Sequence, residues 1–294
     1  MKIGVVDVDG HHFPNLALMK LSAWHKAHGD SVEWHEPLEP DQYDKVYMSK
    51  VFTFSPDYPW AINAKEIVRG GTGYGLYQDL PAEVEYTFPD YSIYPKYPFA
   101  VGFITRGCIR KCPWCVVPRK EGWIHEANTW QNLKRPDSKD LVLMDNNILA
   151  SDFGLSQIES MIGQDIRIDI NQAMDARLIT PEIAKVLSRV KWIGGVLRLA
   201  CDVSAMIPVV RQAVAYLSEA GVKPYRIFVY ALVQDVEEAH KRILALDEMG
   251  VEPFAQPYRD FTGGEPTREQ KALARWCNMK SVHKTTKWED YKWR

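Results

Sequence analysis

Three of the chain's five cysteines lie within eight positions of one another, in the stretch RGCIRKCPWC. Cys108, Cys112 and Cys115 form a C-x3-C-x2-C pattern, whereas Cys201 and Cys277 each stand alone. An odd and low cysteine count in a chain of 294 residues argues against a disulfide framework. We therefore interpret Cys201 and Cys277 as small buried hydrophobic residues, and the three clustered cysteines as metal ligands.

The spacing of these cysteines distinguishes between kinds of metal centre. Structural zinc takes four protein ligands, often from paired C-x2-C segments. The sequence has no second cysteine pair, and His125 lies ten residues after Cys115. Three thiolates from one loop fit a 4Fe–4S cluster that leaves one iron open to a ligand that is not protein, and Trp114 would shield such a cluster from water. A non-catalytic zinc site and a plain electron-transfer iron–sulfur protein remain alternatives.

CIRKCPWC resembles the signature of the radical S-adenosylmethionine (radical SAM) superfamily, C-x3-C-x-aromatic-C, with Trp114 as the aromatic residue. The resemblance implies that Cys108, Cys112 and Cys115 bind a 4Fe–4S cluster and that S-adenosylmethionine (SAM) binds the open iron. It implies reductive cleavage of SAM to a 5'-deoxyadenosyl radical, which abstracts hydrogen from a substrate. An external electron donor of the flavodoxin or ferredoxin type is implied as a partner. The sequence identifies neither the substrate nor a catalytic side chain.

The fold that this resemblance implies is a partial (β/α)6 barrel with the cysteine loop after its first strand. Helical patterns separate the apolar runs of the sequence; one begins after a predicted N-cap at Ser151, and another after Thr180 with Pro181 in the first turn. Strands alternating with helices predict an α/β fold with a parallel sheet or barrel. Six runs are predicted as strands: 99–107, 141–147, 166–171, 195–202, 225–233 and 251–258.

Polar residues follow these predicted strands, at the end where the active sites of such folds lie. The family often has a GGE-like segment after the second strand; this chain has MDNN there, where Asp145 or Asn147 would accept hydrogen bonds from the SAM amino group. The segment INQAMDARLIT resembles one found after the third strand of many members, and Arg198 and Asp202 are candidates for the SAM carboxylate and ribose. The residues predicted to bind SAM are Asp145, Asn147, Asn171, Asp175, Arg198, Asp202 and Tyr230.

Residues 1–88 are predicted to form a small Rossmann-like α/β layer that resembles a truncated cobalamin-binding domain. Such domains carry D-x-H-x-x-G, S-x-L and G-G segments, and this chain has their counterparts in the same order, with proline and valine replacing one glycine and the leucine. The resemblance implies cobalamin as a further cofactor, which makes a cobalamin-dependent radical SAM methyltransferase an alternative function. The matching residues are Asp9, His11, Pro14, Ser49, Val51, Gly70 and Gly71.

The remaining segments complete the predicted organisation: a linker over 89–98, the barrel over 99–265, and a C-terminal helix with a basic and aromatic strap over 266–294. We expect the strap to pack on the barrel; RNA binding by its lysines and tryptophans is the alternative. The net charge of −2 implies no general attraction to nucleic acid or membrane. Without a bilayer-length apolar run or a signal-peptide pattern, the sequence predicts a cytoplasmic protein.

Overall fold

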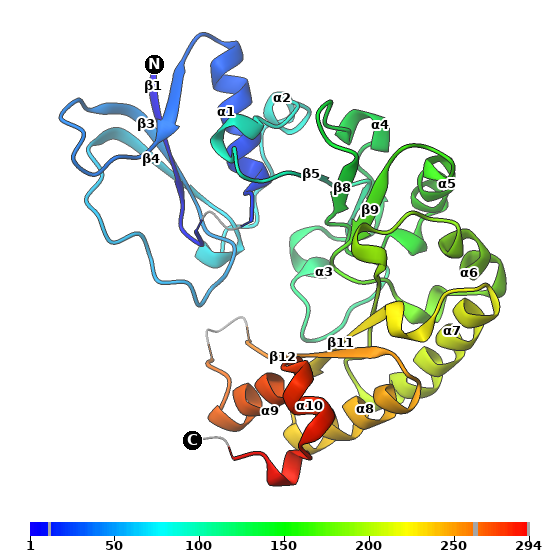
Figure 1. The fold of residues 1–294 in the computed structure, drawn as a ribbon. Coiled ribbons are helices and arrows are strands. Elements are labelled where there is room, and N and C mark those ends of the chain that lie inside the picture. Colours follow the sequence, from blue (N-terminus) through cyan, green and yellow to red (C-terminus); the bar gives the residue numbers. More distant parts are fainter. Residues whose placement is uncertain (11–12, 261–263, 293–294) are drawn as a thin grey trace. The chain divides into compact units, whose positions relative to one another are not determined.

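The computed structural model describes residues 1–10, 13–260 and 264–292, which fold into two compact units. The first comprises residues 1–98, and the second begins at Phe99 (Figure 1). Both contain parallel sheets together with helices, so the prediction of an α/β protein is confirmed. None of the helices in the described part of the chain has the length and apolar character needed to cross a membrane.

The first unit contains one four-stranded parallel sheet in the order β2-β1-β3-β4. The central strand β1 has the sequence KIGVVD and is almost entirely buried, as expected for a parallel strand covered on both faces. Helix α1 begins after Asn15, whose side chain accepts a hydrogen bond from the backbone N–H of Leu18. The bounds are β1 Lys2–Asp7, α1 Leu16–Ala27, β2 Ser31–Trp34, β3 Tyr43–Ser49, β4 Ala64–Gly70 and α2 Ala82–Glu85.

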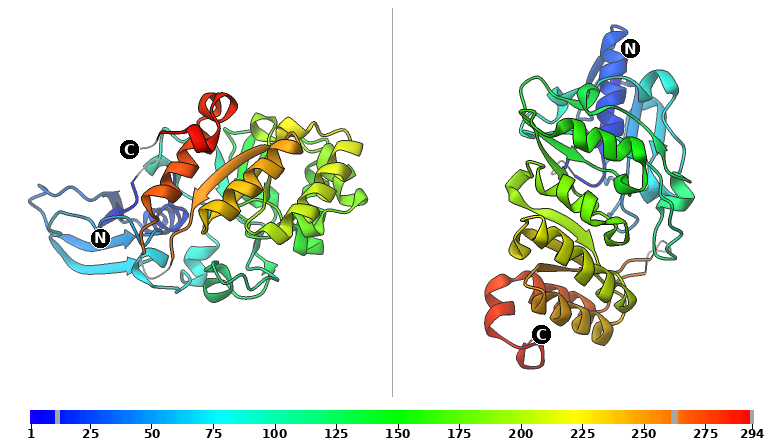
Figure 2. Two further views of the ribbon diagram at one scale, coloured as in Figure 1. Left: turned by 90° about the horizontal axis from the view of Figure 1, so that it is seen from below. Right: turned by 90° about the vertical axis from the view of Figure 1, so that its right-hand side faces the viewer.

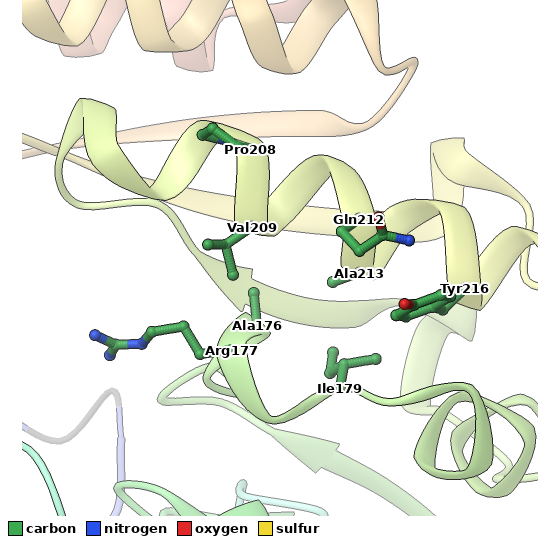
Figure 3. A pocket seen from close by; sticks show the side chains of 8 residues that line it. All are labelled: Ala176, Arg177, Ile179, Pro208, Val209, Gln212, Ala213 and Tyr216. Carbon is green, nitrogen blue, oxygen red and sulfur yellow. The ribbon is translucent and has the colours of Figure 1, made fainter.

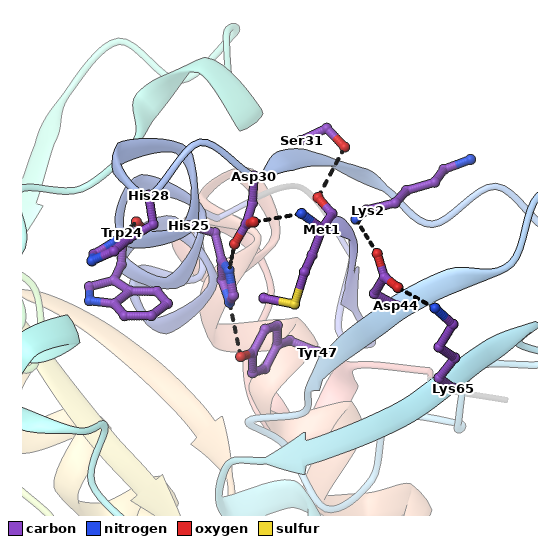
Figure 4. A network of polar contacts seen from close by, with 10 residues as sticks. All are labelled: Met1, Lys2, Trp24, His25, His28, Asp30, Ser31, Asp44, Tyr47 and Lys65. Carbon is purple, nitrogen blue, oxygen red and sulfur yellow. Dashed lines mark hydrogen bonds and ion pairs between the residues drawn. The ribbon is translucent and has the colours of Figure 1, made fainter.

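A buried histidine joins α1 to the sheet (Figure 4). His25 is 2% exposed; its Nδ1 lies 2.6 Å from an Asp30 carboxylate oxygen and its Nε2 lies 3.0 Å from the Tyr47 hydroxyl. Asp30 precedes β2 and Tyr47 lies on β3, so one side chain connects the helix to the two sides of the central strand β1. The satisfied ring nitrogens explain why an imidazole is tolerated in this core.

Residues 89–98, predicted as a linker, pack against the first unit. Asp90 accepts hydrogen bonds from Ser22 Oγ at 2.6 Å and Lys26 Nζ at 2.7 Å, both on α1. The buried Tyr94 donates its hydroxyl to Asp7 at 2.7 Å. Burial raises the pKa of Asp7 to about 6, although the Tyr94 hydrogen bond opposes that shift. This segment therefore belongs structurally to the first unit.

The second unit contains two three-stranded parallel sheets, ordered β5-β8-β9 and β10-β11-β12. Two isolated parallel bridges, Ile168 to Trp192 and Met174 to Leu199, connect the neighbourhoods of β9 and β10. The strands of the described residues do not form a closed barrel. The strand bounds are β5 Ala100–Gly102, β8 Asp140–Leu143, β9 Arg167–Ile170, β10 Leu197–Ala200, β11 Ile227–Val233 and β12 Glu252–Pro257.

Four helices make the crossovers between successive strands and lie along the outer side of those strands (Figures 1 and 2). The N-caps predicted from sequence are confirmed, because Ser151 accepts a hydrogen bond from the N–H of Gly154 and Thr180 accepts one from Ile183. Crossover helices of this kind are what parallel neighbouring strands require. The bounds are α5 Asp152–Met161, α6 Pro181–Ser188, α7 Ile207–Glu219 and α8 Val236–Glu248.

The last three strands present two different faces. Leu199, Val229 and Ala255 are buried in the core that the helices cover, whereas the alternate residues are only partly buried. Phe228, Tyr230 and Phe254 belong to this second set, and their ring centroids lie 5.2–5.8 Å apart. Because side chains alternate across a strand, these residues form the face that lies opposite the helix-covered core.

The C-terminal segment packs on the second unit through α9 (Arg268–Asn278) and α10 (Lys280–Thr285). Asn278 lies against the backbone of β12: its side chain accepts from Ala255 N at 2.8 Å and donates to Ala255 O at 2.9 Å. Trp276 is 2% exposed, and its ring lies near those of His283 and Trp288. Val282, Trp288 and Tyr291, which follow α9, also pack against the core of the second unit, as expected of a packed strap.

Candidate cysteine-loop site

A short antiparallel hairpin closes the base of the cysteine loop. The predicted strand 99–107 is divided: β5 ends at Gly102, and β6 (Thr105–Arg106) pairs antiparallel with β7 (His125–Glu126). The chain between β6 and β7 carries all three clustered cysteines and one helical turn, α3 (Val117–Lys120). The loop therefore follows the first parallel strand of the second unit but is supported by its own two-stranded ladder.

Gly107 begins the loop with a backbone conformation that favours glycine, at φ +79°. A Cβ atom there would lie 2.4 Å from the Trp123 carbonyl oxygen. Next to this close approach, the N–H of Cys108 donates to Gly122 O at 3.2 Å, and that of Cys115 donates to Cys112 O at 3.0 Å. The backbone conformation and hydrogen bonds at Gly107 and Cys108 thus fix the position of the start of the cysteine loop.

Glu121 connects the loop to the segment after β8, and sequence reasoning missed it. Its side chain is 6% exposed. It accepts hydrogen bonds from Gly107 N at 3.1 Å and from Asn146 Nδ2 at 2.6 Å, and lies 3.5 Å from Arg106. Glu121 belongs to no motif, and its partners lie up to 25 residues away. Only the fold reveals this role.

The three clustered thiols, those of Cys108, Cys112 and Cys115, are all partly buried. Burial raises the pKa of Cys115, and the neighbouring Cys112 and Cys108 raise it further. Burial also raises the pKa of Cys112, whereas the positive charge of Arg177 lowers that pKa. Burial therefore favours the neutral form of the Cys112 and Cys115 thiols.

Asn147 supplies a buried polar atom that points to a ligand. The residue is 3% exposed, and its Nδ2 donates to Cys108 Sγ at 3.4 Å. Its Oδ1 is buried and has no hydrogen-bond partner among the described residues. A buried acceptor left unpaired costs about 1–3 kcal/mol. A donor group bound beside Cys108 would satisfy it, which fits the predicted role of Asn147.

Asp145, the other residue predicted to contact the SAM amino group, is used differently. It is fully buried, and its carboxylate accepts hydrogen bonds from the N–H groups of Ile104 and Thr105 and from Thr105 Oγ1. Burial raises its pKa to about 6, against the effect of these bonds. The carboxylate oxygens are thus occupied by the backbone between β5 and β6, which gives Asp145 a structural role.

Two further predicted residues lie beside the loop. Asp175 accepts hydrogen bonds from Arg110 Nε at 3.0 Å and Arg177 Nε at 2.7 Å. Burial alone would raise the pKa of Asp175, but the hydrogen bonds from the two arginines outweigh it and hold the pKa below its usual range. Because Arg177 also influences the pKa of Cys112, this network places positive charge near that thiol.

Asp202 follows β10, and the side chain of Trp114 in the loop lowers its pKa. Burial raises the pKa of Asp202, and the nearby Arg242 opposes that shift. Arg242 is itself fully buried on α8 and donates to Cys201 O and Leu232 O, each at 2.6 Å. A buried arginine thus ties together the ends of β10 and β11 behind the residue that contacts the loop.

The other predicted residues, Arg198, Tyr230 and Asn171, already have protein partners. Arg198 makes a two-point ion pair with Asp169, at 2.7 and 3.0 Å, and its guanidinium lies over the Phe228 ring. Tyr230 donates its hydroxyl to the backbone oxygen of Asn171 at 3.2 Å. These contacts lie on the less buried face of β9, β10 and β11, and not among the described contacts of the three thiols.

A pocket of about 360 Å³ lies between α7 and the turn η4 (Ala176–Leu178) (Figure 3). Arg177 is its only charged lining residue, and Figure 3 shows that side chain directed away from the others. The pocket therefore shares one residue with the loop but has little polar chemistry of its own. Its lining consists of Ala176, Arg177, Ile179, Pro208, Val209, Gln212, Ala213 and Tyr216.

In the first unit, the residues matching the cobalamin-domain segments follow strands of one parallel sheet. Ser49 ends β3 and accepts a hydrogen bond from Asn15, and Gly70 ends β4. Asp9, just after β1, accepts from Ser55 Oγ at 2.6 Å. At Gly71 a Cβ would lie 2.2 Å from Lys50 O, so close packing against the backbone is enough to require glycine at this position. His11 lies outside the described residues.

Comparison with known proteins leaves the chain without an assigned family. No family model matches it, and no curated protein matches it. Within residues 1–10, 13–260 and 264–292, no three histidine, cysteine or acidic side chains lie close enough together to share a single metal ion. A functional assignment therefore depends on the arrangement around the cysteine loop.

Proposed function

We propose that the protein is a radical SAM enzyme acting on a substrate that remains to be identified. The observation that carries the proposal is the pairing of Cys108 with Asn147, whose amide nitrogen contacts the thiol while its buried oxygen lacks a partner. A ligand bearing an N–H donor and bound at the cysteine loop would complete this arrangement. The amino group of SAM has that chemistry.

We further propose that the two parallel sheets of the second unit act together as a partial (β/α)6 barrel. Their six strands follow one another in chain order, and each of the last four connections carries a helix of eight residues or more. The cysteine loop follows the first strand, Asn147 the second, and Asp202 the fourth. In parallel folds, ligands bind at this end of the strands.

In this proposal, different residues of the site would bind the cluster and SAM. The thiolates of Cys108, Cys112 and Cys115 would each hold a different iron, an arrangement distinct from three ligands on one ion. Asn147 Oδ1 would accept a hydrogen bond from SAM, and Arg177 would offset negative charge beside Cys112. When bound, the cluster and SAM would supply the reductive cleavage that yields a 5'-deoxyadenosyl radical.

The proposal is tested first by loading the protein with iron and sulfide under anaerobic conditions. We expect about four irons per chain and absorbance near 400 nm, as for cysteine-ligated clusters. Separate Cys108→Ala, Cys112→Ala and Cys115→Ala variants should lose both, whereas Cys277→Ala, in the buried core, should retain them. Tight binding of one zinc ion and no cluster would contradict the proposal, and would favour a zinc site.

Cobalamin dependence is a second candidate, supported by one observation. Asp9, Ser49 and Gly70 follow β1, β3 and β4, so the three matching segments lie at the same edge of a parallel sheet. We would incubate the full chain with hydroxocobalamin and measure the cobalamin retained after gel filtration. Stoichiometric retention, lost in a Ser49→Trp variant that fills this edge, would support the candidate; no retention would exclude it.

A further inference from the structure

A second pocket of the second unit lies at the start of β10 and β11. Its volume is about 250 Å³, and its walls come mainly from the chain between α6 and β10 and the chain between α7 and β11. Asp202, beside the cysteine loop, follows β10 instead, so the two sites lie at opposite ends of this strand. We call this cavity the basic pocket, after the cations Lys191, Lys223 and Arg226 that line it.

The lining of the basic pocket carries three positive charges and no carboxylate. Lys191, Lys223 and Arg226 are all exposed, and none of them forms an ion pair with a residue in 1–10, 13–260 or 264–292. Asp165 lies near enough to Lys191 for the two charges to interact, but it is paired with Lys139 and does not line the pocket. Like charges around one concavity repel one another, so an anion bound between them is favoured.

The wall beside these cations is apolar and ordered. Trp192 and Val222, which line the pocket, pack against the core of the second unit. Trp192 Nε1 donates to Leu187 O at 3.1 Å, which fixes the orientation of its ring. Lys191 Nζ donates to Gln164 O at 3.1 Å, which leaves two of its three N–H donors for a ligand. The basic pocket therefore combines a fixed apolar wall with a cationic rim.

We propose that the basic pocket binds a small organic phosphate monoester. A phosphate monoester carries a charge of about −1.5 to −2 at pH 7, so it balances three cations better than a singly charged carboxylate. The planar guanidinium of Arg226 has the geometry to contact two phosphate oxygens at once, while the lysines act as point charges. The organic part of the ligand would lie against Trp192 and Val222.

The size of the basic pocket limits its ligand to a small molecule. Its volume of about 250 Å³ is below the ~300–1,000 Å³ of sites for drug-sized ligands. Its lining contains no residue of the cysteine-loop site, so the ligand is bound independently of the proposed function. Binding is therefore measurable without a cluster, SAM or a reductant.

Isothermal titration calorimetry of the full-length protein tests this site with three probes. Phenyl phosphate carries both groups that the basic pocket is expected to bind, whereas inorganic phosphate lacks the apolar part and phenol lacks the charge. We expect saturable binding of one phenyl phosphate per chain, weaker binding of inorganic phosphate and no binding of phenol. The affinity for phenyl phosphate should fall as the salt concentration rises, because salt screens exposed charges.

Two triple variants show whether this binding occurs in the basic pocket. Neutralising its three cations should lower the affinity for phenyl phosphate at least about tenfold, because each cation is expected to donate a hydrogen bond to the phosphate. The matched control removes three exposed positive charges elsewhere in the second unit and should keep the wild-type affinity. The pocket variant is Lys191→Gln/Lys223→Gln/Arg226→Gln, and the control is Lys185→Gln/Arg268→Gln/Lys284→Gln.

Three results would overturn the proposal. The first is no saturable binding of phenyl phosphate by the wild type, or the same affinity in the wild type and the pocket variant. The second is benzoate binding as tightly as phenyl phosphate, which would show that phosphate is not the group recognised. The third is single-stranded RNA binding that is lost in the pocket variant, without phenyl phosphate binding by the wild type, which would assign the cations to a nucleic acid.

Discussion

At the scale of single residues, Asn147 and Asp145 show how adjacent polar positions take different tasks. The Asn147 oxygen is buried and unpaired, while the Asp145 carboxylate holds the backbone at Ile104 and Thr105. Asn147 is therefore available to a ligand, whereas Asp145 stabilises the start of the loop. The two substitutions should consequently affect different measurements.

Asn147→Ala should weaken SAM binding without unfolding the protein. Loss of one hydrogen bond to a charged amino group costs about 1.5–3 kcal/mol, or roughly 10- to 150-fold in Kd. Equilibrium binding of SAM to the cluster-loaded protein measures this change. Asn146→Ala is the neighbouring control: it removes the hydrogen bond to Glu121 and should lower cluster content instead. Unchanged SAM affinity in Asn147→Ala would remove Asn147 from the site.

Asp145→Asn should destabilise the second unit. An amide cannot accept all the backbone hydrogen bonds that the carboxylate receives, and its NH2 group would face an N–H donor. We expect a loss of about 1–3 kcal/mol in the free energy of unfolding at neutral pH. Urea unfolding monitored by tryptophan fluorescence measures it. A stability equal to that of the wild type would show that these contacts are dispensable.

At the scale of elements, the conformation of the cysteine loop depends on the β6–β7 hairpin and on the glycine at its first position, Gly107. Gly107→Ala combines a positive φ with a Cβ only 2.4 Å from the Trp123 carbonyl. The backbone must shift, which moves Cys108 away from Asn147. We expect cluster content to fall severalfold while the far-ultraviolet circular dichroism stays close to that of the wild type. Gly122→Ala is the control, because a Cβ there meets no atom within 4 Å, although φ is again positive.

The C-terminal helices carry a pH-dependent contact. His283 lies 2.8 Å from Asp247 and 3.1 Å from Cys277 O. The hydrogen bond to Asp247, followed by the Cys277 side chain, raises the pKa of His283 to about 10. Because the folded pKa exceeds the unfolded value of about 6.5, this stability is fully present below pH 6.5 and is lost as pH rises through 10. Asp247 is over a third exposed, so we expect about 1 kcal/mol.

Two variants, His283→Gln and Asp247→Asn, test the contact between His283 and Asp247. The difference in unfolding free energy between the wild type and His283→Gln should be largest near pH 6 and should shrink towards pH 10.5. Asp247→Asn should abolish most of that pH dependence, because it removes the charge that favours the protonated ring. A difference that stays constant with pH would contradict the assignment.

At the scale of the whole molecule, local sequence signals were sufficient for the strand and helix order. Caps such as Ser151 and Thr180 act within one helical turn, so the sequence alone predicts them. The cysteine motif is likewise contiguous. The partners of Asp145 and Arg198 were not predictable, because they come from other strands and depend on register. The division of strand 99–107 depends on β7, twenty residues later.

The boundary between the two units could not be predicted from sequence patterns. Proline and tyrosine in 89–98 are typical of a linker, but Tyr94 and Asp90 find partners on β1 and α1. Those contacts span 64 to 87 residues of sequence. Composition indicates where a chain is polar or stiff, whereas the packing partner of a segment is set by the tertiary fold.

The most direct test of the central claim is product formation from SAM. The anaerobically reconstituted protein is mixed with dithionite and SAM, and 5'-deoxyadenosine is quantified by liquid chromatography. The account predicts 5'-deoxyadenosine from the wild type, and none from a Cys108→Ala/Cys112→Ala/Cys115→Ala variant. A cluster-loaded wild-type protein that leaves SAM intact, or cleavage that persists in the triple variant, would contradict it.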